Sequence, residues 1–299
     1  MKLTGRAMIC GLAALAASCP ASGEDAAPLT MAGVLEASTP AEWRRPDPLN
    51  TLYLELASGR VVIELAPAFA PAHVANIKAL VQAGYFDGAV VLRSQDNYVV
   101  QWGRTEGNPG PTGDAQRALP GEYSRALGED MPFTPVPDAD PYAPQTGFSG
   151  GFPVARDPAT GTAWLVHCYG MVGAGRGMAP DSGSGAELYA VTGHAPRHLD
   201  RNVTLVGRVI AGIERLSVLP RGSGPLGFYE TAAEHVPIVS ARLAADVPAA
   251  ERTDIELLRT DSASFAALIE ARRVRREEWF IEPTGRIEVC NVPLPTRTP

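Results

Sequence analysis

An alternation of apolar and polar residues near position 51 restricts the fold of this chain more than any other feature. In residues 51–56, TLYLEL, every second residue is leucine, which is typical of a strand with one buried face. The turn ASGR follows, and residues 61–65, VVIEL, repeat the alternation. Two such runs with a glycine-containing turn between them predict an antiparallel hairpin. We therefore expect a chain that is mainly β.

A helix is predicted soon after this hairpin. Pro71 favours the first turn of a helix, and Gly84 is typical of a helix end. The apolar positions between them follow helical spacing, at Val74, Ile77, Leu80 and Val81. Two strands and a helix thus precede the segment with the candidate chemistry.

Residues 90–104, VVLRSQDNYVVQWGR, contain the strongest candidate for a functional side chain. Arg93 follows an apolar run, Tyr98 starts a second run, and Gln101 comes at its end. A guanidinium group offers five donors in a rigid fork and stays charged. These residues can therefore line a small pocket that handles a neutral polar group. The alternative is a surface arginine whose stem lies on apolar neighbours.

The same window resembles, without a gap, the active-site stretch of the cyclophilin-type peptidyl-prolyl isomerases. On the family pattern Arg93 falls on the catalytic arginine, and Gln101 falls on the glutamine that orients the peptide carbonyl. Tyr98 falls on a pocket phenylalanine and Val99 on a methionine. The order of strands, helix and catalytic segment is also similar to that of the family.

Residues 170–193, GMVGAGRGMAPDSGSGAELYAVTG, resemble the second half of the family's pocket. With one inserted residue allowed, pocket positions fall on Ala174, Gly175, Glu187 and Tyr189, and Tyr189 is expected to form the floor. Glu187 replaces a glutamine of the family pattern. Its carboxylate can either pair with Arg93 and hold it, or weaken its charge.

Residues 195–219 are similar to the family's late segment. His198 stands where tryptophan is frequent, Leu199 falls on the pocket leucine, and Val203 replaces a histidine. We therefore expect Leu199 to take part in substrate binding, while His198 is either a contact of the substrate or a loop or capping residue.

The resemblance covers about residues 50–246 and implies a closed antiparallel β-barrel with flanking helices. It implies peptidyl-prolyl cis-trans isomerase (rotamase) activity without a cofactor, acting on proline-containing peptides and unfolded exported proteins. The histidines and cysteines show no metal-ligand spacing, so no metal is expected. A second possibility is a catalytically weak module of the same fold that binds proline-containing peptides or envelope proteins. That possibility is favoured by Val91 and Leu92, which replace the family's Phe-His pair, and by the departures at Glu187, His198 and Val203.

Three segments lie outside the family pattern. Residues 24–49 are expected to form a linker, residues 105–163 a long inserted loop, and residues 247–299 a C-terminal extension. Within the extension, the apolar spacing predicts an amphipathic helix over 262–280 and a short strand over 286–292. Just after the insertion, residues 164–172 are predicted to form one buried strand.

The first 23 residues have the pattern of a signal peptide. Lys2 and Arg6 are positive, residues 7–17 are apolar, and residues 21–23 form a small-x-small cleavage site. The apolar run is too short for a transmembrane helix. We therefore expect assistance to protein folding in the bacterial periplasm, with a lipoprotein anchored at Cys19 as the alternative.

Cys168 and Cys290 are the two cysteines beyond the signal region. Two cysteines in an exported protein suggest a disulfide, although a free, buried Cys168 is equally compatible with the sequence. The net charge of −7 and pI near 5.3 argue against a nucleic-acid partner.

The insertion also contains a short motif that is known from hydrolases. Residues 147–151, GFSGG, fit the G-x-S-x-G motif of serine hydrolases at Ser149. The sequence predicts neither the buried strand before this motif nor the helix after it, so the motif is a weak indication of hydrolase chemistry.

Overall fold

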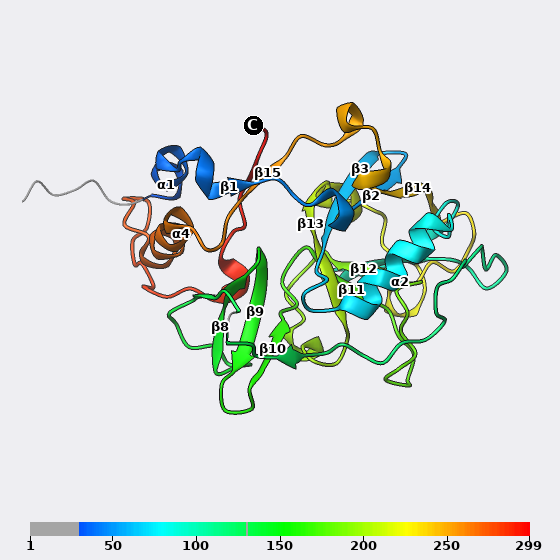
Figure 1. The fold of residues 1–299 in the computed structure, drawn as a ribbon, viewed down its shortest axis with the longest axis horizontal. Coiled ribbons are helices and arrows are strands. Elements are labelled where there is room, and N and C mark those ends of the chain that lie inside the picture. Colours follow the sequence, from blue (N-terminus) through cyan, green and yellow to red (C-terminus); the bar gives the residue numbers. More distant parts are fainter. Residues whose placement is uncertain (1–29, 130) are drawn as a thin grey trace, which may run out of the picture.

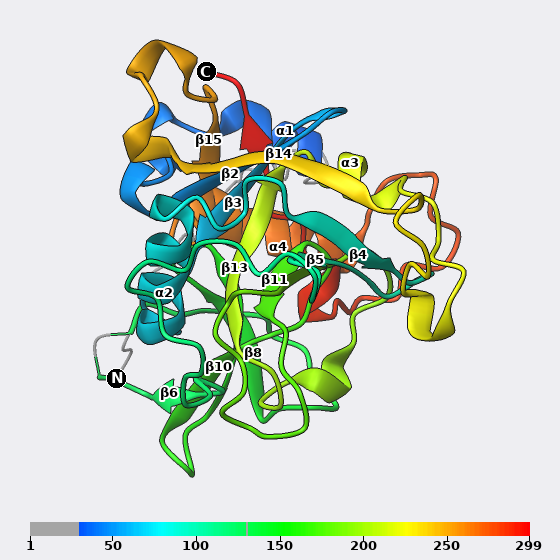
Figure 2. The same ribbon diagram turned by 90° about the vertical axis from the view of Figure 1, so that its right-hand side faces the viewer.

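A closed eight-stranded barrel forms the centre of the protein, seen in a computed structural model that describes residues 30–129 and 131–299. Neighbouring strands are antiparallel throughout, in the order β11-β12-β5-β4-β14-β2-β3-β13 (Figures 1 and 2). The mainly β chain and the closed antiparallel barrel predicted from the sequence are thus confirmed. The barrel strands are β2 Thr51–Leu56, β3 Gly59–Leu65, β4 Val90–Ser94, β5 Val99–Gly103, β11 Met171–Ala174, β12 Leu188–Val191, β13 Leu205–Ala211 and β14 Val236–Leu243.

The first hairpin and helix follow the sequence patterns closely. β2 and β3 pair from Thr51↔Glu64 to Leu56↔Gly59, and Gly59 has a φ of 120°, which an L side chain rarely adopts. α2 (Pro71–Gln82) begins at the expected proline, and its four apolar positions are buried in the same cluster as the barrel interior. In the described part of the chain, no helix has the length and hydropathy needed to cross a bilayer.

The insertion is not only a loop, because residues 125–165 contain a second sheet. Its strands are β6 Arg125–Ala126, β7 Thr134–Pro135, β8 Gln145–Ser149, β9 Phe152–Asp157 and β10 Thr162–Leu165, in the order β6-β10-β9-β8-β7. Prolines and glycines between these short strands hide the alternation that identifies a strand in a sequence. The single strand expected over 164–172 is also wrong, since β10 ends at Leu165 and β11 begins at Met171 in a different sheet.

The two ends of the described chain pair with each other. β1 (Trp43–Arg44) pairs with β15 (Glu256–Leu258), which pairs with β16 (Thr296–Arg297). α1 (Met31–Ala37) packs on α4 (Ala263–Val274). Residues 31–44 therefore do not form a linker, because their pairing partners lie more than two hundred residues away in the sequence.

The C-terminal extension differs from its prediction in two places. α4 ends at Val274, since Arg275 has a φ of 49°, and Trp279 beyond it is 83% exposed. Residues 286–292 contain a 3-10 turn at Val289–Asn291 in place of the predicted strand. The final strand is β16, closer to the end of the chain.

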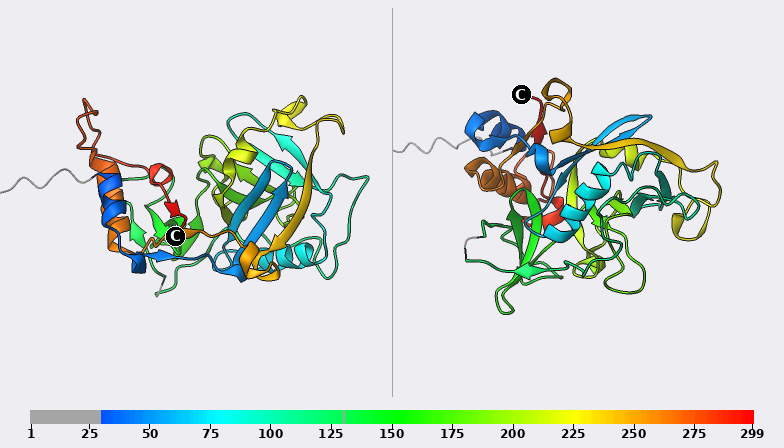
Figure 3. Two further views of the ribbon diagram at one scale, coloured as in Figure 1. Left: turned by 90° about the horizontal axis from the view of Figure 1, so that it is seen from above. Right: turned by 45° about the vertical axis from the view of Figure 1, so that its right-hand side comes forward.

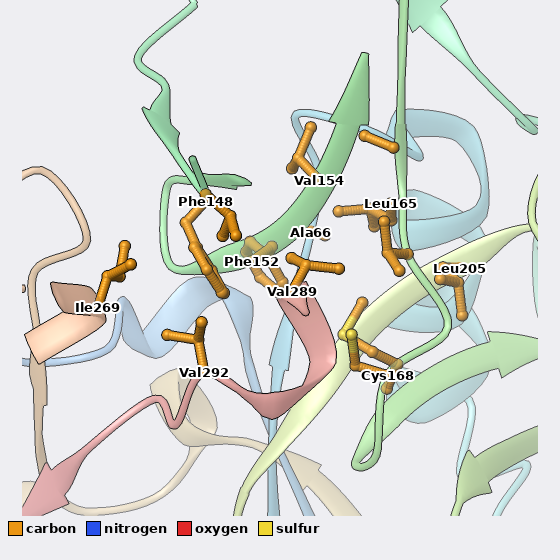
Figure 4. Packing of buried hydrophobic residues seen from close by; sticks show 14 of the residues in the cluster. Ala66, Phe148, Phe152, Val154, Leu165, Cys168, Leu205, Ile269, Val289 and Val292 are labelled. Atoms are coloured by element: carbon orange, nitrogen blue, oxygen red, sulfur yellow. The ribbon is translucent and has the colours of Figure 1, made fainter. Parts of the chain in front are cut away.

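We call residues 31–44, 125–129, 131–165 and 255–299 together the accessory module. It lies beside the barrel, with α1 and α4 at the far side and the second sheet nearer to the barrel (Figure 3). One buried cluster joins the two parts, containing Phe148, Phe265 and Val289 of the module together with Val99 and Tyr189 of the barrel. Figure 4 shows Phe148, Phe152 and Val289 packed toward Cys168 and Leu205. The outer wall of the barrel is thus continuous with the core of the module.

A disulfide fastens the C-terminal tail to this shared core. Cys168, in the connection between β10 and β11, is bonded to Cys290 in the 3-10 turn of the tail. Of the two states that the sequence left open, the structure contains the disulfide. It links positions 122 residues apart and therefore restricts the unfolded chain strongly.

Removing this cross-link is expected to lower the free energy of unfolding by about 2–4 kcal/mol, because the open chain regains the entropy that the closed loop had lost. Equilibrium urea unfolding of the oxidised protein, with and without dithiothreitol, measures the difference. A variant with both Cys168→Ala and Cys290→Ala is the control and should not respond to the reductant. Equal midpoints for the oxidised and reduced protein would contradict the prediction.

Candidate active site

A pocket of about 190 Å³ lies on the outer wall of the barrel, where β4, β5 and β12 are neighbours. The register places Arg93 opposite Gln101, and Gln101 opposite Tyr189. Val100 and Trp102 are buried in the barrel interior, so the alternate residues of β5 face outward. The pocket is lined by Arg93, Tyr98, Val99, Gln101, Gly175, Arg176, Tyr189, Leu199 and Val203.

Arg93 is held firmly at one side of this pocket. Its Nε donates to the carbonyl oxygen of Leu226 at 2.7 Å, and its Nη1 donates to Gln101 Oε1 at 3.4 Å. The guanidinium carbon lies 5.5 Å from the ring centre of Tyr98 and 5.2 Å from that of Phe228. Burial lowers the pKa of Arg93 from its ordinary value, and the Tyr98 hydroxyl opposes this change. A fixed cation between two rings is the result.

Glu187 acts on Arg93 through Gln101. The Nε2 of Gln101 donates to Glu187 Oε2 at 2.6 Å, while its Oε1 accepts from Arg93. Only this orientation of the amide gives the carboxylate a donor and the guanidinium an acceptor. Glu187 therefore neither pairs directly with Arg93 nor lines the pocket; it sets the orientation of the amide beside Arg93.

Tyr189 forms the floor of the pocket and is only 6% exposed. Its hydroxyl lies 2.9 Å from Nε2 of His167, whose Nδ1 lies 2.9 Å from Asp200 Oδ1. Because the carboxylate needs a donor, Nδ1 carries the proton and the Tyr189 hydroxyl donates to Nε2. Burial lowers the pKa of His167 below 6.5 despite the opposing effect of Asp200, so this ring is neutral.

Gly173 allows the tyrosine to reach this position. A Cβ atom on Gly173 would come within 2.3 Å of the phenol carbon and oxygen of Tyr189. That distance is far inside van der Waals contact, so the residue must lack a side chain. The hydroxyl end of Tyr189 thus runs beneath the backbone of β11 toward His167, and its ring remains as an apolar floor.

Besides Glu187, two of the expected site residues do not line the pocket. Ala174, the last residue of β11, points into the barrel interior and is 2% exposed, because successive residues of a strand face opposite sides and its neighbour Gly173 faces outward. The exposed His198 does not line the pocket, but its ring stacks on Tyr98 at 6.3 Å between centres. The expected residues that do line the pocket are Arg93, Tyr98, Val99, Gln101, Gly175, Tyr189 and Leu199.

Sequence reasoning missed Arg176, His167 and Phe228. Arg176 lines the pocket and follows directly after Gly175, a predicted pocket residue, so its place in the sequence could have identified it. His167 lies in a connection that was predicted to be a strand, and its role depends on Asp200, 33 residues away. Phe228 is 135 residues beyond Arg93 in the sequence, and only the folded chain brings their backbones together.

Ser149 lacks the surroundings of a hydrolase nucleophile. It is the last residue of β8, and the next strand, β9, pairs back onto it as a hairpin. A nucleophile elbow instead needs a strand followed by a helix. The structure therefore gives no support to the hydrolase motif.

Comparisons with known proteins agree with this geometry. The family model described as "Cyclophilin type peptidyl-prolyl cis-trans isomerase/CLD" matches residues 51–242, more than half of the chain. The chain is 28% identical to a "Probable peptidyl-prolyl cis-trans isomerase" of Brucella suis over 178 residues, which are 59% of this chain and 74% of that protein. It is 36% identical over 55 residues, 18% of this chain and 33% of the relative, to a peptidyl-prolyl cis-trans isomerase of Streptomyces antibioticus.

A solved structure extends the likeness beyond the matched stretch. The crystal structure of the cyclophilin AquaCyp293 from Hirschia baltica superposes with a TM-score of 0.70 at 28% identity. The superposition covers 90% of this chain and 97% of that one, so it includes parts of the accessory module. With a matching family model and a closely similar fold, the chain belongs to the cyclophilin-type peptidyl-prolyl cis-trans isomerase family and is an isomerase of that family.

Proposed function

We propose that this isomerase turns prolyl peptide bonds of unfolded exported proteins in the bacterial periplasm, at the pocket that contains Arg93. The observation that carries the proposal is the position of Arg93, which is held between two aromatic rings beside an apolar floor. The floor accepts the proline ring, and Arg93 provides the donor.

The chemistry follows from the nature of the barrier. Rotation about a peptide bond costs about 18–20 kcal/mol because resonance is lost, and prolyl bonds exchange slowly without help. When the bond is twisted, its nitrogen gains a lone pair that can accept a hydrogen bond. A donor aimed at that nitrogen stabilises the transition state more than the planar ground state. The reaction needs no covalent intermediate.

Arg93 retains donors for this role. Three of its five N–H groups have partners among the described residues: the Leu226 carbonyl, Gln101 and Gln95. One N–H on each terminal nitrogen is therefore left for a substrate. Gln101 likewise keeps its second Nε2 hydrogen, because Glu187 takes only one. That hydrogen can hold the carbonyl oxygen of the bound peptide.

Two features support a periplasmic location. Residues 1–23, which lie outside the described residues, have the charge and apolar pattern of a signal peptide. The Cys168–Cys290 disulfide is typical of proteins in oxidising compartments. Anchoring at Cys19 is the alternative form of the exported protein.

The variant Arg93→Ala should lower kcat/KM by about 10- to 100-fold, since a charged hydrogen bond contributes about 1.5–3 kcal/mol to the transition state. A protease-coupled assay with a proline tetrapeptide measures it. Arg156, stacked 3.8 Å from the ring of Phe133 in the accessory module, supplies the matched control, and Arg156→Ala should retain full activity. Unchanged turnover in Arg93→Ala would show that Arg93 has no part in the mechanism. A wild-type protein without isomerase activity would instead favour the alternative function, the binding of proline-containing peptides.

The variant Glu187→Ala should lower kcat/KM by about 2- to 5-fold, because the Gln101 amide is then free to turn. The size of the effect follows from the contribution of an exposed charged contact, which is about 1 kcal/mol or less. Glu187→Gln is the control, because its amide oxygen still accepts from Gln101 and should preserve most activity. The same tetrapeptide assay applies. An equal loss in the glutamine and alanine variants would show that the charge of Glu187, and not the acceptor that orients the amide, is what matters.

For the location, the full chain expressed in a Gram-negative host should appear in the periplasmic fraction with its N-terminus at Glu24. Fractionation followed by intact-mass measurement tests this, with a cytoplasmic enzyme as the leakage marker. Recovery in the membrane fraction that is abolished by Cys19→Ala would instead establish the lipoprotein. Retention in the cytoplasm would contradict both forms.

A further inference from the structure

The 3-10 turn Arg197–Leu199 carries one wall of the pocket. Leu199 lines the pocket directly, and His198 stacks on Tyr98. The first residue of the turn, Arg197, points the other way and is 5% exposed. The geometry of this wall therefore depends on what holds Arg197 inside the protein.

Carboxylates from three segments surround Arg197. Its Nε donates to Asp200 Oδ2 at 2.7 Å, within the same loop. Its two terminal nitrogens donate to both oxygens of Asp140, at 2.8 and 3.0 Å, and Nη1 also donates to Glu288 at 3.0 Å. Asp140 belongs to the insertion and Glu288 to the C-terminal tail, so both come from the accessory module. The exposed fractions of the Arg197 and Asp140 side chains are only 4% and 2%.

The same group of residues reaches the floor of the pocket. Asp200 accepts from Arg197 with one oxygen and from the Nδ1 and backbone N–H of His167 with the other. His167 in turn accepts from the hydroxyl of Tyr189. One continuous buried network thus holds both Leu199 in the wall and Tyr189 in the floor. Its far end is fixed by the accessory module.

We propose that Arg197 is a positioning residue for the isomerase pocket, and that Asp140 and Glu288 of the accessory module hold it in place. A two-pronged arginine–carboxylate contact has a defined geometry, and a buried charge that loses its partner must move or take in water. Small displacements of pocket walls have large effects on bound substrates. The inference rests on the proposed function in assigning substrate binding to the Arg93 pocket.

The substitution Asp140→Asn tests the proposal, since it removes the charge and one acceptor without touching the pocket. We expect kcat/KM for a proline tetrapeptide to fall about 3- to 10-fold. The loss should lie mainly in KM, because the wall and the floor bind the proline ring while Arg93 keeps its donors. Exchange NMR measures the rate, and peptide titration of the same sample measures Kd without depending on catalysis.

Asp138 supplies a matched control. It lies two residues before Asp140, and its Oδ2 accepts from the backbone N–H of Ile287 at 2.9 Å. Asp138→Asn therefore weakens a contact between the insertion and the tail without removing a hydrogen-bond partner of Arg197, and it should retain the activity and Kd of the wild type. A general loosening of the accessory module would affect both variants alike.

A double-mutant cycle with Leu199→Ala separates positioning from simple stabilisation. If Asp140 acts through the turn, its effect on Kd should largely disappear once the Leu199 side chain is gone. Glu288→Gln, at the more exposed edge of the cluster, is the substitute if Asp140→Asn does not fold, with a smaller effect in the same direction. Additive effects, an unchanged Kd, or an equal loss in Asp138→Asn would overturn the proposal. An inactive wild type with these Kd changes would overturn only the proposed catalysis.

Discussion

The alternation of side chains around a closed eight-stranded barrel is the constraint on which the rest of the structure depends. Inward positions such as Val100 and Trp102 fill the interior, and a barrel of this size has no room for a ligand among packed side chains. The outward positions of the same strands, including Gln101 and Tyr189, are therefore the ones available to a substrate. The site must lie on the outer wall.

An outer wall rich in apolar residues needs cover from water. The accessory module provides much of this cover, since its core is continuous with Val99 and Tyr189, and the Cys168–Cys290 disulfide fixes the tail against it. The pocket remains open where the cover ends. The accessory module thus packs next to the site, although none of its described residues contributes a pocket-lining side chain.

The tyrosine at the pocket floor depends on three other residues for its position. A buried hydroxyl without a partner would cost free energy, so Tyr189 needs the acceptor that His167 supplies. His167 needs Asp200 to fix its proton, and the ring of Tyr189 needs the missing side chain at Gly173. These four residues form one structural unit on three separate segments.

The sequence by itself determined the hairpin at 51–65 and the helix that begins at Pro71, because strand alternation and helix ends are visible in consecutive residues. It also determined that Arg93, Tyr98 and Gln101 lie near one another, because they are close neighbours in the chain. Tertiary structure alone decided the second sheet and the pairing of residues 43–44 with the tail, since such short strands have no signal without their partners. It also decided the contacts of Arg93 with Phe228 and of Arg197 with Asp140 and Glu288. Those side chains are far apart in the chain, and only closure of the barrel and packing of the module bring them together.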